Sequence, residues 1–322
     1  MIIVIARRVG QAVATLAVGS VLVWSLLALA PGDPARRVLA TNNVTSPTAA
    51  QVTAKRVELG LSGQPVARYG RWLAGAARGD LGTSWVTGRP VRHELGSRLP
   101  ATLRLTAAAV ALALGVALLL GCVAASAPGR WPDLAIRLAA LPALVLPSFV
   151  VGLVLLQVVV LRLAQFRVIS DGSWSTVFLP ALTLALATAA TWSRILRAGL
   201  LQARGAPHVE VARARGAGRA RLLLVHDLPN ALVPFLTVVG AGVAALLGGA
   251  PIVETVFTWP GVGRFAVQGI TSRDLPVVQG YALLGITAYV AVSLVVDLIA
   301  MAVDPRTAPA STRRVRLSRS GR

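Results

Sequence analysis

The chain has 322 residues, of which 55% are hydrophobic and only 14% charged, and its mean hydropathy is +0.71. Soluble domains carry about 25% charged residues, so this composition excludes an ordinary soluble protein, and the single Cys122 excludes a disulfide framework. The net charge of +20 could indicate a nucleic-acid-binding protein, but the basic residues lie almost entirely outside the apolar segments rather than on one face of a soluble fold. We therefore expect a polytopic membrane protein that binds no nucleic acid.

Six apolar segments are long enough to be transmembrane helices, which need about 20 residues. The first resembles a signal peptide in having Arg7 and Arg8 before it, but its apolar run is longer than the apolar core of a usual signal peptide. We interpret it as a retained span and expect an all-α polytopic protein with six transmembrane helices. The expected spans are approximately 9–31, 103–126, 134–161, 177–201, 229–256 and 277–302.

The distribution of arginine predicts the orientation, because short cytoplasmic loops carry an excess of Lys and Arg. With the N-terminus inside, the short cytoplasmic segments and the two tails hold 17 arginines, and the two short outer loops hold 4. We expect both termini to be cytoplasmic.

The long segment 32–102 is then extracytoplasmic. Apolar residues recur at helical spacing in 66–76, around Tyr69 and Trp72, and again at Val91, Leu95 and Leu99. Two interpretations stay open: amphipathic helices at the outer membrane interface, or a small folded cap. The polar stretch 41–53 is typical of a loop.

The chain lacks the motifs of an enzyme or of an ATPase. Its only lysine, Lys55, follows no glycine-rich loop and so cannot form a P-loop. Three histidines lie on different segments, so we expect no catalytic centre and no metal site; they are His93, His208 and His226. Asp297 is the only acidic residue well inside an apolar segment, which favours a packing role over the proton pathway of a carrier.

The segment 207–230 lies between the fourth and fifth spans, on the predicted cytoplasmic side. Residues 210–215 favour a short helix, and Gly216-Ala217-Gly218 can end it. Residues 219–225 favour a second short helix before Pro229 begins the next span. The result is a helix–turn–helix that could receive force from a soluble partner.

This segment resembles the signature of bacterial ABC-importer permeases, E-A-A-x3-G-x9-(I/H)-x-L-P. Val211 stands where the first Ala is usual. The residues that carry the match are Glu210, Ala212, Gly216, His226, Leu228 and Pro229.

Further motifs resemble the dipeptide/oligopeptide/nickel branch of these permeases, and the resemblance extends from about residue 2 to 306. The chain is most similar to the first of the two permease subunits of that branch, in its nickel type. The motifs are Pro31-Gly32-Asp33-Pro34, Gly79-Asp80-Leu81-Gly82, Pro100-Ala101-Thr102-Leu103, the run 254–263 and Arg273-Asp274.

The resemblance implies a type I ABC-importer permease fold in the bacterial cytoplasmic membrane, with one transmembrane domain over 1–306. The Arg/Ser tail 307–322 lies outside it and is expected to be basic and disordered. It implies a coupling segment, about 204–228, that docks on an ATPase; the alternative is an arginine-rich loop that holds anionic lipid headgroups. Implied partners are a second, homologous permease, two ATPase subunits that bind ATP and Mg, and an extracytoplasmic binding protein. The chain itself is then no enzyme and binds no cofactor.

The run ETVFTWPGVGRF has an interpretation of its own. Trp259-Pro260-Gly261 breaks the helix at the outer face, and Phe257 and Trp259 suit a membrane interface. Either a re-entrant turn forms the outer gate or mouth, or the run is a plain extracellular loop.

The cargo is weakly determined, because the binding protein mainly selects it. Short peptides and chelated nickel both fit the resemblance. The alternative function is a gradient-driven carrier or channel that works without ATPases.

Overall fold

The computed structural model describes residues 2–29, 32–41, 44, 46–162 and 170–303. Within these ranges every regular element is a helix, and the only β-pairing is an isolated bridge between Thr83 and Pro90. The predicted all-α class is confirmed. The tail 307–322 lies outside the described residues, as does the side chain of Asp297.

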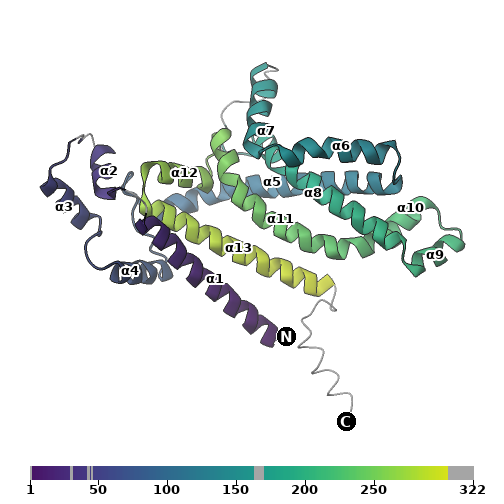
Figure 1. Ribbon diagram of the computed structural model, residues 1–322, viewed down its shortest axis with the longest axis horizontal. Helices are drawn as coiled ribbons and strands as arrows, with labels where there is room; N and C mark the ends of the chain where they lie inside the picture. The colour runs from purple at the N-terminus through teal and green to yellow at the C-terminus, as the bar shows by residue number, and fades with distance from the viewer. Residues whose placement is uncertain (1, 30–31, 42–43, 45, 163–169, 304–322) are drawn as a thin grey trace, which may run out of the picture.

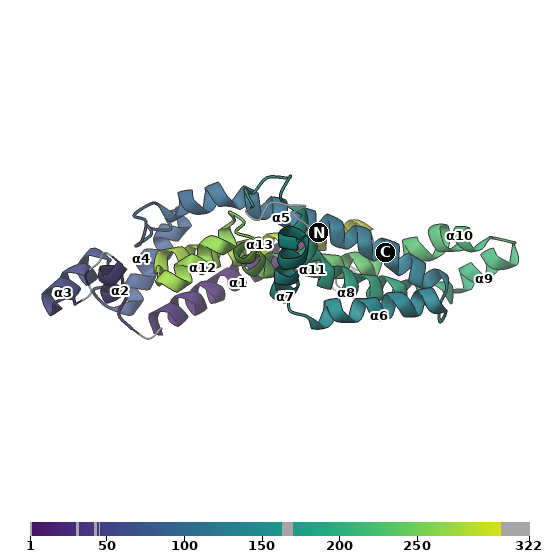
Figure 2. The ribbon, with the colours of Figure 1, turned by 90° about the horizontal axis from the view of Figure 1, so that it is seen from above.

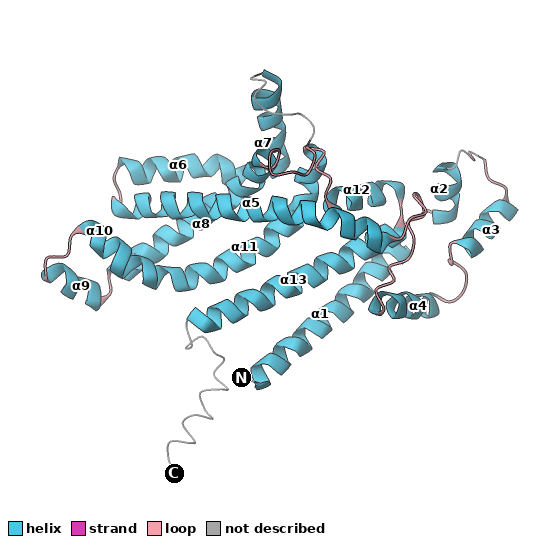
Figure 3. Cartoon of the chain, turned by 180° about the vertical axis from the view of Figure 1, so that it is seen from behind, coloured by secondary structure: helices cyan, strands magenta, loops and turns pink. Residues whose placement is uncertain are grey.

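The molecule is an elongated bundle of long helices (Figures 1 and 2). One end carries three short helices and α12 (Val262–Ser272), and we call it the cap end. The opposite end, from which α9 (Pro207–Ala214) and α10 (Arg219–Arg221) project, is the elbow end. The start of α1 and the end of α13 both lie away from the cap end (Figure 3). The long helices are α1 (Ile2–Leu29), α5 (Val91–Ser126), α8 (Phe178–Arg204), α11 (Leu228–Val256) and α13 (Leu275–Val303).

The predicted spans are helical in the structure. Four helices in the described part are long and apolar enough to cross a membrane, namely α5, α8, α11 and α13, and α1 contains a shorter apolar stretch over Gly10–Ser25. The third predicted span, 134–161, is wrong as a single helix. It is divided into α6 (Trp131–Val145) and α7 (Ser148–Leu155), with a bend of 102°, and a π-helical turn (Leu156–Arg162) follows α7.

Proline explains that bend. Leu146 precedes Pro147 and takes an extended conformation, with ψ 129°, because a residue before proline is disfavoured in the helical region. The helix therefore ends, and α7 runs at a steep angle to α6 (Figures 1 and 3). Its Gly152 still packs against the bundle, since a Cβ there would lie 3.3 Å from Thr183 Cγ2 of α8.

Small residues bring α5 and α8 close together along their whole contact. Buried alanines and glycine recur every four residues on α5, and a similar series lies on α8. A Cβ on Gly121 would lie 3.0 Å from Leu196 Cδ2 and 3.1 Å from the Ser193 carbonyl. Such small-residue stripes let helices in a membrane approach closely. The two series are Ala109, Ala113, Ala117, Gly121 and Ala125, and Ala181, Ala185, Ala189 and Ser193.

The cap end contains more helix than predicted. The stretch 41–53 is a loop only in part, because Thr48 and Gln51 form a capping box that starts α3 (Ala49–Glu58). A further helix, α2 (Pro34–Thr41), precedes it. The periodic residues 91–99 do not form a separate helix; they are the first turns of α5, which has 36 residues and at about 1.5 Å per residue is about 54 Å long.

The predicted helix 66–76 is present as α4 (Pro65–Ala77). Its Tyr69 ring lies 5.8 Å from that of Trp24 on α1, and the Tyr69 and Ser20 hydroxyls are 2.9 Å apart. These contacts attach α4 to the end of α1.

Candidate functional site

The elbow, residues 207–227, begins with α9 (Pro207–Ala214), on which Glu210 is exposed and Ala212 half-buried. The chain turns just after this helix at Gly216, which has a φ of +83° and open space around it. The amide of Ala217 donates to the Ala212 carbonyl, and that of Gly216 to the Arg213 carbonyl. The predicted turn is therefore confirmed. Glycine suits this position because it adopts the left-handed conformation without strain.

The second half of the elbow differs from the prediction. Residues 219–225 do not form a separate short helix: α10 (Arg219–Arg221) continues through a π-helical segment, η2 (Leu222–Asp227), directly into α11. His226 lies next to the last residue of η2, and its carbonyl accepts a hydrogen bond from Asn230 Nδ2 at 2.7 Å. Leu228 packs against a buried hydrophobic cluster formed by α5, α8 and α11, whereas Pro229 is exposed.

A buried ion pair attaches η2 to the bundle. The side chain of Asp227 is fully buried, and its Oδ2 accepts from Arg204 Nε at 3.1 Å. Arg204 also donates from Nη1 to the Ala125 carbonyl at 2.8 Å. The end of α8 therefore holds η2 on one side and the end of α5 on the other.

A second ion pair lies close to this end of the bundle. Both oxygens of the buried Asp133, on α6, accept from Arg197 of α8 at 2.6 Å, and the Gly129 amide adds a bond at 2.9 Å. Bidentate pairs between arginine and carboxylate are among the strongest hydrogen-bonded contacts in proteins. The helices at the base of the elbow are thus tied to one another by charged groups as well as by apolar packing.

At the cap end, α11 is followed by what we call the WPG turn, residues 257–261. Phe257 and Trp259 are buried, at 2% and 0% exposure, so their predicted place at a membrane interface is wrong. Trp259 Nε1 donates to the Ala101 carbonyl of α5 at 3.0 Å. Pro260 is exposed, and the turn is fastened to the bundle rather than being a plain loop.

A buried carboxylate organises this turn. Glu254, which is fully buried near the end of α11, accepts from Thr102 Oγ1 at 2.6 Å and from the Arg264 amide at 2.8 Å. Thr102 Oγ1 in turn accepts from the Val262 amide at 2.9 Å. A Cβ on Gly261 would overlap Glu254 Oε1, so the carboxylate occupies the place of a side chain.

Comparison with known proteins identifies the chain. Residues 117–309 match the family described as binding-protein-dependent transport system inner membrane component. The chain belongs to this family.

Two relatives place the permease in the peptide/oligopeptide branch of the ABC importers. The glutathione transport system permease protein GsiC of Escherichia coli O6:H1 is 35% identical over 302 residues, which cover 94% of this chain and 97% of that protein. GsiC of Salmonella paratyphi A is 35% identical over 301 residues, covering 93% and 96%.

A solved structure supports the fold. A chain from the crystal structure of an amino acid ABC transporter with histidines matches with a TM-score of 0.53 and 21% identity, covering 64% of this chain and 92% of that one. The expected type I permease fold is therefore confirmed.

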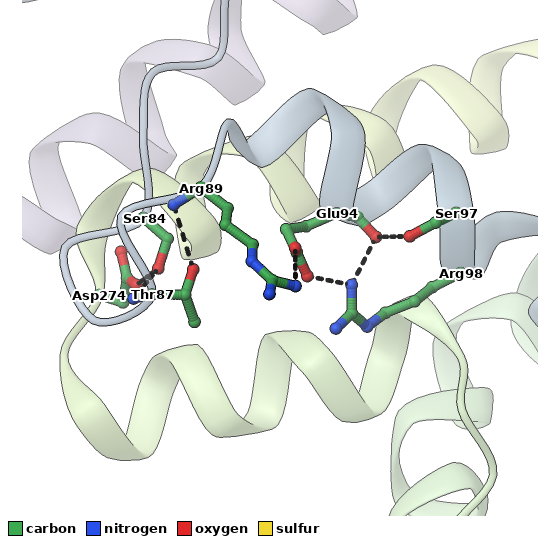
Figure 4. Close-up of polar contacts among 7 residues, drawn as sticks. All are labelled: Ser84, Thr87, Arg89, Glu94, Ser97, Arg98 and Asp274. Carbon is green, nitrogen blue, oxygen red and sulfur yellow. Dashed lines mark hydrogen bonds and ion pairs between the residues drawn. The ribbon is translucent and has the colours of Figure 1, made fainter.

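Several polar residues of the permease were not foreseen as contacts. Thr102 and Glu254 belong to separate sequence motifs, and the structure joins them. Asp274 likewise accepts from Ser84 Oγ at 2.5 Å and from the Trp85 amide at 3.1 Å, which joins Arg273-Asp274 to the loop after Gly79-Asp80-Leu81-Gly82 (Figure 4). For Thr102, Glu254 and Asp274, the signal available in the sequence was an acidic or hydroxyl side chain near the end of an apolar segment.

Proposed function

We propose that the elbow of this ABC-importer permease is the surface on which a partner ATPase acts, and that its movement opens and closes the WPG turn. The observation that supports this proposal best is the Arg204–Asp227 ion pair. Because Asp227 is fully buried and Arg204 also holds the Ala125 carbonyl, η2 cannot shift without moving α8 and α5.

Two helices connect the elbow with the WPG turn. α5 contacts Arg204 through Ala125 near one end and contacts Trp259 and Glu254 through Ala101 and Thr102 near the other. α11 follows η2 directly and ends beside Glu254. At about 1.5 Å per residue these connections are about 36 Å and 40 Å long, enough to cross the hydrocarbon core. A rigid displacement at the elbow is therefore delivered to the turn by two routes.

The energy for this movement comes, in the proposal, from ATP bound by the partner ATPases. ATP shifts the equilibrium between inward-open and outward-open states only if it binds one of them more tightly. Two ATPases, a second permease and an extracytoplasmic binding protein complete the importer. The elbow and both termini then face the cytoplasm, and the cap faces outward, as the arginine distribution predicts.

The proposed cargo is a short peptide. The relatives that match over almost the whole chain are named for the transport of glutathione, a peptide with free carboxylates. The description of the family as dependent on a binding protein disfavours a carrier that works alone. Chelated nickel remains a prediction from the sequence resemblance.

The test of coupling compares two glycines of the elbow that differ in backbone conformation. Gly216 has a φ of +83°, whereas Gly218 has a φ of −67°, and a Cβ added to either residue would have no atom within 4 Å. Gly216→Leu should distort the elbow at a cost of about 1–2 kcal/mol, whereas Gly218→Leu adds the same bulk without this strain. The measurement is the ratio of ATP hydrolysed to peptide imported by the reconstituted importer.

We expect Gly216→Leu to raise that ratio severalfold while the assembly still purifies intact, and Gly218→Leu to change it less. Equal ratios in the two variants and the unmodified importer would contradict the coupling role of the elbow. Peptide accumulation by liposomes that contain this chain alone would contradict the importer itself.

A further inference from the structure

A cleft of about 400 Å³ lies at the cap end beside the WPG turn. One wall is the first part of α5, and the other includes Gly172 and Pro260. We call it the basic cleft; its charged and polar lining residues are Arg89, His93, Glu94, Ser97, Arg98, Arg104 and Asp171.

Glu94 fixes the arginines of this cleft. It is 4% exposed, and its carboxylate pairs with Arg98 one helical turn later and with Arg89 Nη1 at 3.5 Å (Figure 4). The Arg98 guanidinium also lies 4.4 Å from the centre of the Phe265 ring. A buried carboxylate needs such partners, so it holds two guanidinium groups in place before any ligand arrives.

These arginines keep unused donors. Among the described residues, the hydrogen bonds of Arg98 are all made by Nη1, to the carboxylate and the carbonyl of Glu94. A guanidinium carries five N–H donors. Arg89 is 73% exposed, and Arg104 uses Nε on the Pro100 carbonyl at 3.2 Å. The remaining donors are available to an acceptor in the cleft.

The acidic residue on the facing wall offsets only part of the positive charge of this site. Asp171 Oδ1 accepts from the Ser173 amide at 2.9 Å and from Thr176 Oγ1 at 2.8 Å. Hydrogen bonding by the side chain and the amide of Ser173, and by Thr176, lowers the pKa of Asp171 to about 2, so it is ionised at neutral pH and engaged by its own loop. Three guanidinium groups then face two carboxylates, each already occupied, which leaves the cleft with a net positive charge.

We propose that the basic cleft binds the terminal carboxylate of the peptide cargo on its way to the WPG turn. A planar guanidinium matches a carboxylate through two parallel hydrogen bonds, and this geometry favours a carboxylate over a neutral amide. The concave shape suits the end of a small molecule. The proposal rests on the proposed function for the identity of the cargo as a peptide.

The position of the cleft connects binding with the turn. Pro260 lines the cleft, and a Cβ on Gly172 of the same wall would lie 2.8 Å from Pro260 Cγ. A carboxylate held by Arg89 and Arg98 therefore lies next to the residue that projects from the WPG turn, where opening of the turn would admit the rest of the peptide.

Protection of a cysteine placed in the cleft tests this proposal. Ser97 is exposed in the cleft and Cys122 is the only native cysteine of this chain, so the assembled importer carries this chain with Ser97→Cys and Cys122→Ser. The rate of labelling by a neutral maleimide is measured without ATP and without binding protein, in the presence of millimolar trialanine or of its C-terminal amide. We expect trialanine to slow labelling severalfold and the amide to have little effect.

Arginine variants test which guanidinium groups donate hydrogen bonds to the peptide carboxylate. Arg89→Gln should abolish the protection by trialanine, and Arg98→Lys, which keeps a cation for Glu94 but removes the planar fork, should weaken it. Arg92→Gln is the matched control, because Arg92 is exposed on the same helix and does not line the cleft.

Equal protection by peptide and amide would overturn the assignment of a carboxylate. If neither protects but a binding protein free of cargo does, the cleft is a contact surface for that protein and the proposal is wrong. ATP-driven uptake, measured separately on the same cysteine variant, shows whether the proposed function fails, because the labelling requires no ATP.

Discussion

The elbow and the WPG turn both depend on glycine, but for opposite reasons. Gly216 has open space around it and is required for its positive φ. Gly261 has an ordinary φ of −97° and no space at all, because the Glu254 carboxylate fills the position of its side chain. One region is defined by backbone conformation on an exposed surface, and the other by close packing around a buried charge.

This difference separates the two functions that the importer requires. In the proposed function, an exposed elbow with a fixed shape presents a surface to a partner, and it is held to the bundle by the Arg204–Asp227 ion pair together with apolar packing of Leu223. A turn locked by several hydrogen bonds has few alternative conformations. We infer that the elbow transmits movement and the WPG turn changes between discrete arrangements, and the following variants test that contrast.

The largest effect is expected from removing the positive partner at the base of the elbow. Arg204→Met leaves Asp227 buried and uncompensated, which should lower the free energy of unfolding by about 3–5 kcal/mol. Thermal unfolding of the purified assembly measures the loss. Arg213→Met, an exposed change on α9, is the control and should have little effect. Recovery of most of the stability in the double variant Arg204→Met, Asp227→Asn would confirm the cause.

The next effect is expected at the WPG turn. Gly261→Ala places a methyl group against Glu254 Oε1, so either the carboxylate or the turn must shift, at a cost of about 2–3 kcal/mol. Gly248→Ala on α11 has open space and serves as the control. Thermal unfolding compares the two. If Gly261→Ala unfolds at the same temperature as the control, close packing against Glu254 does not determine the stability of the WPG turn, and the contrast with the elbow is wrong.

The sequence predicted the helical class and the positions of the spans, because each depends on the local count of apolar residues. It also predicted the turn at Gly216, since a glycine after a short helical pattern has few other roles. The bend at Pro147 was missed because an apolar run of sufficient length favours one continuous span. The interfacial placement of Phe257 and Trp259 failed because aromatic residues at a helix end suit both an interface and a core.

The contacts of the candidate site could not be predicted in the same way. Thr102 and Glu254 are 152 positions apart in the chain, and Arg204 appeared only as one of many arginines on the predicted cytoplasmic side. Periodicity reports which face of a helix is apolar, but it does not report which helices are neighbours. The pairing of buried charges is therefore a property of the assembled bundle.

The smallest effect is expected from removing one hydroxyl group that contacts the WPG turn. Thr102→Val removes the donor to Glu254 and the acceptor for the Val262 amide, and should lower the free energy of unfolding by about 1–2 kcal/mol. Thr106 lies one helical turn later on α5, is also buried, and its hydroxyl has no hydrogen-bond partner in the described structure. Thr106→Val should therefore be neutral or slightly stabilising, because it exchanges an unsatisfied hydroxyl for a methyl group of similar size. Thermal unfolding of the two variants measures the difference, and equal losses would show that burial of α5 alone, rather than the hydrogen bonds to the turn, determines the stability of the cap end.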